Sequence, residues 1–297
     1  MAARTNVILA GAFALMAAVP VCAQQAATAE YVGWEVCQAC HNEVTAVWQQ
    51  TPMGRIFLTA PRNELESRGC EACHGPGSEH AQAGDSTGIL RYSANSPATV
   101  EEKNESCLQC HNDGGRLHWS GSAHETRELA CVQCHSVMKE ISPERLLAKP
   151  TVAEVCTQCH LQRKAQAQLS SHMPLREGQL DCADCHNPHG STGPSLLVED
   201  SVNEVCFQCH AERRGPFLWE HAPVTESCLN CHEPHGSMND NLLKVRAPRL
   251  CQRCHIENRH PTTPQDPTAR FAFNRSCTNC HSQIHGSNHP SGVRFHR

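Results

Sequence analysis

The sequence predicts an elongated, mostly coiled chain with short α-helices and almost no β-sheet. Aromatic residues make up only 4% of the 297 positions and the mean hydropathy is -0.48, so side chains alone would struggle to offset the chain entropy of folding. The pentapeptide C-x-x-C-H recurs along the whole chain, and its copies fall into pairs. No alternating strand pattern persists, and Pro and Gly interrupt the segments between the motifs.

The first 23 residues are typical of a cleaved signal peptide. Arg4 supplies a positive charge, residues 7–21 are apolar, and small residues surround a cleavage point at 21–23. A membrane-spanning helix needs about 20 apolar residues, more than this run offers. A lipid anchor on Cys22 stays open, although the residues before it form a poor lipobox. We expect residues 1–23 to be a signal peptide and 24–297 to be one cofactor-binding domain.

Every cysteine after residue 24 belongs to a C-x-x-C-H motif. Twenty cysteines in an oxidising compartment could form ten disulfides, but their spacing indicates c-type haem instead. Both thiols bond to the haem vinyl groups, and the adjacent His is an axial ligand of the iron. Zinc and thioredoxin-like C-x-x-C pairs do not require a His after every pair. The motifs are Cys37-Cys40-His41, Cys70-Cys73-His74, Cys107-Cys110-His111, Cys131-Cys134-His135, Cys156-Cys159-His160, Cys182-Cys185-His186, Cys206-Cys209-His210, Cys228-Cys231-His232, Cys251-Cys254-His255 and Cys277-Cys280-His281.

Ten covalently attached haem c groups would supply the missing core. The predicted fold class is therefore a multihaem cytochrome c, mostly coil with short α-helices wrapped around an elongated chain of ten haems. Residues 41–57 and 160–170 are the best helix candidates. Covalent attachment also restricts the unfolded chain, as other crosslinks do.

The motifs form five two-haem repeats. We call the first motif of each repeat, ending at His41, His111, His160, His210 and His255, the opening motif, and the second the closing motif. From Cys107 on, equivalent motifs recur every 45 to 51 residues, and Leu-Leu pairs at 146–147, 196–197 and 242–243 follow three closing motifs. A helical solenoid can have such a period, but these repeats have too few apolar residues to stack without haems.

Regular offsets also mark candidates for the second axial ligand. His124, His172 and His221 lie eleven to thirteen residues after the His of an opening motif, where the first repeat has Met53. His189, His235 and His285 lie three or four after the His of a closing motif, where another repeat has Met138. A Met/His pair would raise the potential of its haem above that of a bis-His one. One ligand per iron is obtained with Met53, His80, His124, Met138, His172, His189, His221, His235, His260 and His285.

The competing assignment uses only histidines and treats both methionines as packing residues. Its main substitute is His118; His289 and His296 are the other histidines outside the motifs. In either assignment enough ligands exist to make every iron six-coordinate. A multihaem reductase needs an open iron position, and no other catalytic constellation stands out. We therefore expect an electron carrier with no catalytic residues, not an enzyme.

Charge is distributed unevenly along the chain. The formal net charge is -5, and it becomes -6 when Arg4 leaves with the signal peptide. Residues 241–297 carry nine Lys or Arg against two acids, whereas residues 24–110 carry five against eleven. The basic side chains could neutralise haem propionates, or the two ends could dock different partners. Nucleic-acid binding is not expected of an exported, net acidic protein.

Three segments carry a resemblance to a known family. GPFLWEHAPV at 215–224, SSHMPL at 170–175 and RSCTNCHSQIHGSNHPSG at 275–292 resemble the DmsE/MtrA-type decahaem cytochromes. The resemblance implies a periplasmic, wire-like cytochrome inside an outer-membrane β-barrel porin-like protein, with its C-terminal haem facing outward. It would connect an inner-membrane or periplasmic electron donor to an extracellular cytochrome, reductase or metal oxide; iron-oxidising relatives run inward. Met53 and Met138 depart from an all-bis-His pattern.

Physical constraints agree with that expectation. Closely spaced haems are needed to carry electrons across a hydrocarbon layer of about 30 Å. A polar chain cannot span lipid alone, and a barrel would shield it. The alternatives are a soluble periplasmic shuttle to a terminal reductase and, less favoured, a multihaem reductase.

Overall fold

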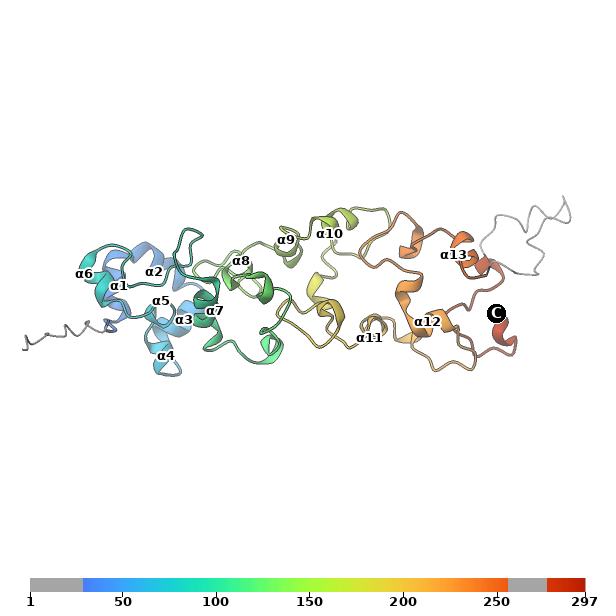
Figure 1. Cartoon of the computed structure of the whole chain (residues 1–297), viewed down its shortest axis with the longest axis horizontal. Helices are drawn as coiled ribbons and strands as arrows, with labels where there is room; N and C mark the ends of the chain where they lie inside the picture. The colour runs from blue at the N-terminus through green and yellow to red at the C-terminus, as the bar shows by residue number, and fades with distance from the viewer. Residues whose placement is uncertain (1–28, 256–276, 297) are drawn as a thin grey trace, which may run out of the picture.

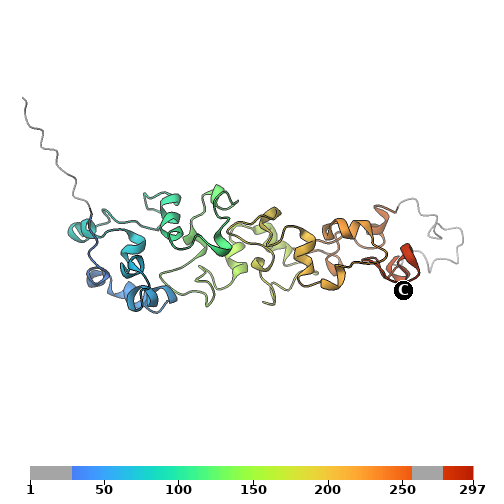
Figure 2. The same ribbon diagram turned by 90° about the horizontal axis from the view of Figure 1, so that it is seen from below.

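The computed structural model describes residues 29–255 and 277–296. The chain runs from one end of an elongated body to the other, with α1 to α7 at one end and α12 and α13 near the opposite end (Figure 1). The same progression is visible after a quarter turn about the long axis (Figure 2). Sequence order and spatial order therefore coincide, as the expected row of cofactors requires. The signal peptide and His260 lie outside the described residues, so both remain predictions.

The described residues form many short helices and isolated antiparallel β-bridges but no sheet. The longest helix among the described residues has nine residues. The α-helices are α1 Trp34–Cys40, α2 Asn42–Trp48, α3 Pro52–Thr59, α4 Glu64–Ser67, α5 Glu71–His74, α6 Ser78–Ala83, α7 Val100–Leu108, α8 Cys131–Cys134, α9 Val152–Cys156, α10 Leu161–Gln166, α11 Val202–Phe207, α12 Ala222–Glu226 and α13 Arg249–Gln252. The 3-10 turns are Gly114–Arg116, Glu125–Arg127, Cys182–Asp184, Pro194–Leu196, Ala211–Arg213, Cys228–Asn230, Asp240–Leu242, Cys277–Asn279 and Gly292–Arg294. This confirms the prediction of a mostly coiled chain with short α-helices and almost no β-sheet.

The helices that lead into opening motifs begin at side-chain caps. Thr99 and Thr151 each accept a backbone N–H from a Glu three residues later, and that Glu accepts the N–H of the Thr in return. Ser201 accepts the N–H of Glu204 in the same way. Such caps satisfy amides that the first helical turn leaves without partners. They fix where α7, α9 and α11 begin, and hence where the opening motifs lie.

The helix predicted over 41–57 is wrong in one respect, because the structure divides it into α2 and α3. Thr51 caps α3 through its hydroxyl, which accepts the N–H of Gly54, and Pro52 occupies the first helical position. The turn is tight: a Cβ at Gly54 would lie 1.9 Å from the carbonyl oxygen of Trp48. The second predicted helix, 160–170, is shorter than expected and forms α10.

The apolar core made by side chains is very small. Buried hydrophobic residues among the described ones are Trp48, Phe57, Ala72, Ala130, Leu147, Val155 and Val205. Only the first three pack into one cluster, at the N-terminal end. Side-chain packing therefore cannot organise the rest of the molecule, as composition predicted.

A loop with the same geometry follows three closing motifs. Arg145–Leu146, Ser195–Leu196 and Asn241–Leu242 all have positive φ angles between 49° and 60°. In each loop the next Leu forms an antiparallel bridge with the motif His: Leu147 with His135, Leu197 with His186 and Leu243 with His232. Left-handed backbone is unfavourable for such residues, so the surrounding hydrogen bonds must hold it. The Leu-Leu pairs noticed in the sequence mark this loop.

No helix within residues 29–255 and 277–296 is long and apolar enough to cross a membrane.

We predict that the haem-free chain does not fold. Residues 24–297 produced without haem attachment should behave as an expanded coil, because so few side chains are buried and the cofactors are needed as the core. Small-angle scattering should give a radius of gyration near the unfolded value of about 60 Å for this length. The haem-loaded protein is the control, and a haem-free form as compact as that control would contradict the prediction.

Candidate haem-binding sites

Six motif histidines face a histidine from outside the motifs at nearly the same spacing. Their ring centroids are 6.0 to 6.3 Å apart, and five of the six pairs are stacked within 24° of parallel. The pairs are His41–His80, His160–His124, His135–His189, His186–His235, His255–His221 and His232–His285. All six non-motif members are among the ten ligand candidates named from the sequence, and five of them, all except His80, were selected by their offsets within the repeats.

This spacing fits one iron between the two rings. With a metal–nitrogen distance of about 2 Å and roughly 1 Å from nitrogen to ring centre, two opposed imidazole ligands have centroids about 6 Å apart. Direct stacking contact would bring the rings closer. The paired residues therefore have the chemistry and separation to hold a haem iron from both sides.

Hydrogen bonds to backbone carbonyls orient the imidazoles. The Nδ1 atoms of His135, His186 and His232 each bond to a carbonyl of the left-handed loop, at Arg145, Ser195 and Asn241, with distances of 2.9 to 3.0 Å. Nδ1 of His124 bonds to the carbonyl of Pro188, and Nδ1 of His221 to that of Ile284, at 2.7 and 2.9 Å. Each bond leaves Nε2 for the metal and fixes the ring plane, as outer-shell partners of metal-binding histidines do. The strained loops thus serve to aim the motif histidines.

Burial keeps two of these imidazoles neutral. It lowers the pKa of His189 to about 4, with the nearby His135 adding to the effect, and it lowers the pKa of His285 to about 4, with Arg213 adding. Only a neutral imidazole has a lone pair to offer a metal. These rings are therefore ready to bind iron throughout the neutral pH range.

The motif cysteines approach one another in a regular alternation. Within each repeat, the first cysteines of the two motifs interact: Cys37 with Cys70, Cys107 with Cys131, Cys156 with Cys182, Cys206 with Cys228 and Cys251 with Cys277. Between repeats, the second cysteines are neighbours: Cys73 with Cys110, Cys134 with Cys159, Cys185 with Cys209 and Cys231 with Cys254. None of the twenty forms a disulfide. Consecutive haem attachment points therefore adjoin along the entire series of motifs.

Not every candidate ligand is paired. His172 turns its ring toward Arg176 and Glu177, with Nε2 at 2.8 and 3.2 Å from them, and does not stack on a motif His. Met53 packs beside the apolar cluster, and Met138 is 37% exposed. His296, which the sequence did not favour, lies 4.7 Å from His281, ring centre to ring centre. The one sequence signal that could have indicated His296 as a ligand candidate is its position after the last motif.

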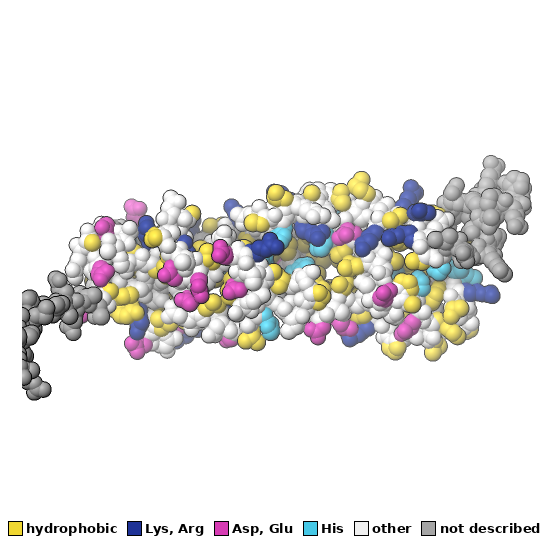
Figure 3. Space-filling model, in the orientation of Figure 1, with side chains coloured by type: hydrophobic (Ala, Val, Ile, Leu, Met, Phe, Trp, Pro, Cys, Tyr) yellow, Lys and Arg dark blue, Asp and Glu magenta, His cyan; other side chains and the backbone are white. Residues whose placement is uncertain are grey.

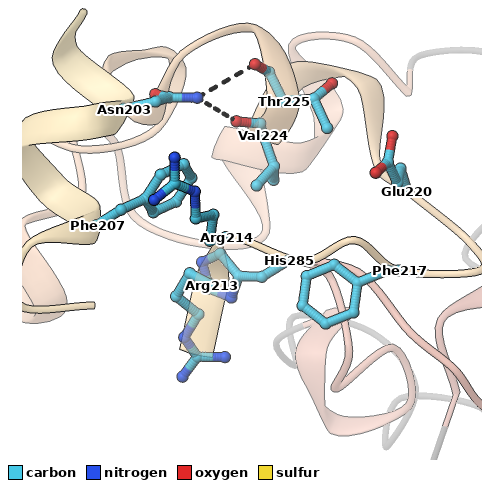
Figure 4. Close-up of a pocket in the computed structure, with 9 residues that line it drawn as sticks. All are labelled: Asn203, Phe207, Arg213, Arg214, Phe217, Glu220, Val224, Thr225 and His285. Carbon is cyan, nitrogen blue, oxygen red and sulfur yellow. Dashed lines mark hydrogen bonds between the residues drawn. The ribbon is translucent and has the colours of Figure 1, made fainter. Parts of the chain in front are cut away.

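Basic side chains gather beside one imidazole pair. A cavity of about 120 Å³ adjoins His285 and is lined by Arg213, Arg214, Phe207 and Phe217 (Figure 4). Arg214 also bonds to Glu204 at 2.8 Å. Guanidinium groups pair well with carboxylates, so this is a suitable place for haem propionates.

Figure 3 shows Lys and Arg along the middle and C-terminal parts of one face, and Asp and Glu mostly over the N-terminal part.

Comparison with known proteins agrees with these sites. Residues 172–215 and 221–260 match the doubled CXXCH motif family, and residues 70–151 match the family of NrfB-like c-type cytochrome proteins. The chain is also 42% identical over 274 residues to the multiheme cytochrome MtrA of Shewanella baltica (strain OS185). That alignment covers 89% of this chain and 81% of the relative.

Removing one facing imidazole should open one iron. In His189→Ala we expect the haem attached at Cys131 and Cys134 to lose its second ligand, because His189 is the ring that faces His135. Carbon monoxide should then bind the reduced protein at about one haem in ten, measured by optical titration. His118→Ala, a change at an exposed histidine, is the control and should bind none. Equal binding by both variants would refute this ligand assignment.

Proposed function

Because the chain belongs to the MtrA family of multihaem c-type cytochromes, we propose that it relays electrons across the outer membrane inside a β-barrel partner. Electron transfer through covalently bound haem c is the function of the protein itself. The location in the membrane, the barrel and the partners at either end are the proposed part. The electron donor would be an inner-membrane or periplasmic protein, and the acceptor an extracellular cytochrome or reductase.

The unbroken series of adjacent motif cysteines carries this proposal. First cysteines adjoin within repeats and second cysteines adjoin between repeats, from Cys37 to Cys277, with no motif left out. Haem iron supplies one-electron chemistry when bound. A chain that holds all its attachment points in one row, along an elongated body, is suited to moving charge over a distance (Figure 1). A carrier that simply diffuses between partners does not need such a row.

The facing imidazoles favour relay over catalysis. Pairs such as His41–His80 and His232–His285 would occupy both axial positions of an iron, which leaves none for a substrate. We propose that all the irons are six-coordinate. Hydrogen bonds to backbone carbonyls hold several of these rings in place, so little reorganisation accompanies a change of iron charge.

The uneven charge suits an oriented position between two partners. The N-terminal part is acidic and the C-terminal part basic, and the two lie at opposite ends of the body (Figures 1 and 3). Complementary charge steers each end to a different protein and sets orientation. A barrel is needed because this polar surface cannot face lipid.

Extraction of native outer membranes tests the proposal. In mild detergent, haem-stained native gels should show the cytochrome migrating with a β-barrel protein, identified by mass spectrometry. The complex should persist after a high-salt wash that releases loosely bound periplasmic proteins. Recovery of all the haem protein free in the periplasmic fraction would overturn the conduit and favour a periplasmic shuttle.

A further inference from the structure

The facing imidazoles follow one rule along the chain. The His of an opening motif faces the residue eleven to thirteen positions after the His of the preceding opening motif, as in His160–His124 and His255–His221. A closing-motif His faces the residue three or four positions after the His of the following closing motif, as in His135–His189, His186–His235 and His232–His285. In these five pairs the second ring comes from a neighbouring repeat. The exceptions are the first and last motifs, where His41 faces His80 and His281 faces His296, each within its own repeat.

Three motif histidines face no other histidine among the described residues: His74, His111 and His210. The rule assigns His172 to His210, and it assigns a methionine to each of the other two. For His74, the position three after His135 is Met138. For His111, the position twelve after His41 is Met53. Both are thioethers, the side chains that serve with His as the axial pair in cytochromes c of raised potential.

We propose that Met138 is the second iron ligand at the motif of His74, and Met53 the second iron ligand at the motif of His111. The inference deepens the proposed function, since it requires haem at these two motifs, but it does not depend on the barrel partner. It places the only two His/Met sites that the rule yields at consecutive motifs near the N-terminal end.

The surroundings of Met53 agree with the assignment. Met53 stands in the first turn of α3, which Thr51 caps with a hydrogen bond of 3.0 Å to Gly54. It packs against the Trp48–Phe57–Ala72 cluster together with Cys70 and Cys73. Cys73 in turn neighbours Cys107 and Cys110, the cysteines of the motif that ends at His111. Met53 thus stands on a capped helix and packs on the same cluster as Cys73, the cysteine that neighbours the motif to which Met53 is assigned.

The surroundings of His74 leave one ring nitrogen for a metal. Its Nδ1 bonds to the carbonyl of Leu90 at 2.7 Å, and the Tyr92 ring meets it edge-on with centroids 5.3 Å apart. The Tyr92 hydroxyl is anchored by donating to the carbonyl of Cys73 at 2.7 Å. The imidazole is therefore oriented in the same way as those of the paired motif histidines.

His118, the competing candidate, lies beside a different site. Its backbone packs on Gly190, where a Cβ would come 1.9 Å from the His118 carbonyl oxygen. Gly190 directly follows His189, which already faces His135. The following residue, Trp119, also has its ring 6.4 Å from that of His189, centroid to centroid. His118 thus belongs to the surroundings of a completed pair.

The assignment has a consequence for the energy profile. A thioether ligand favours the reduced iron relative to a second imidazole. The motifs of His74 and His111 are neighbours through Cys73, Cys107 and Cys110, so two adjacent haems should hold electrons more tightly than the others. Electrons entering the oxidised protein would therefore reduce these two haems first and the remaining haems afterwards.

Methionine methyl resonances of the reduced, haem-loaded protein test the proposal. With ¹³C-methyl methionine labelling, two methyls should show the strong upfield shift that a haem ring current gives to an iron-bound methionine. Met53→Leu should remove one of them and Met138→Leu the other. Met238→Leu is the matched control, because Met238 is 73% exposed and has no place in the rule; it should remove an unshifted signal.

The His variants supply a second readout that does not depend on the loss of a ligand. Met53→His and Met138→His should each keep the iron low-spin and lower the potential of one haem in a spectroelectrochemical titration. Absence of upfield-shifted methyls in the parent protein, or their survival in both Leu variants, would overturn the proposal. Failure to find a barrel complex would leave these signals unchanged, so the two proposals can fail separately.

Discussion

The need of each iron for two opposed ligands is the constraint on which the rest of the structure depends. Five of the ten motif histidines face a ring supplied by the adjacent repeat, at the 6.0 to 6.3 Å spacing that an iron between them requires. Each such pair links two repeats that otherwise share few packed side chains. The result is an extended body in which coordination takes the place of an apolar core, and in which removing the cofactors removes the connections. Its length follows from the same rule, since each repeat reaches only its neighbours.

The backbone is shaped to serve these pairs. Left-handed residues such as Leu196 and Leu242 are costly, yet they recur because their loops present a carbonyl to the Nδ1 of a motif histidine. Capped helices such as α9 and α11 place the opening motifs at regular intervals. The break between α2 and α3 also fixes a ligand candidate, since it sets Met53 in the first turn of a separate helix that packs on the same cluster as Cys70 and Cys73. Local strain and local stability are thus both used to fix ligand positions.

The fold class and the attachment residues could be predicted from sequence for two reasons. The C-x-x-C-H motif is the attachment signature of c-type haem, and the low aromatic content excludes an ordinary core. Offsets within the repeats also selected His189 and His235 as ligand candidates. Which motif each one faces could not be predicted, because His189 is close in sequence to His186 but faces His135. The helix break at Thr51 and Pro52 was missed because its turn depends on the contact between Gly54 and Trp48. The positive φ of Leu146 was missed because it depends on hydrogen bonds made by residues on either side of the motif.

A crystal or electron cryomicroscopy structure of the haem-loaded protein tests the ligand rule most directly. The account predicts that the iron bound to His186 has His235 as its second ligand, and that the iron bound to His135 has His189. Each of these two haems would then be held by two repeats. Density showing instead that the second ligands come from within the same repeat throughout would contradict the account, because the repeats would no longer be linked by their irons.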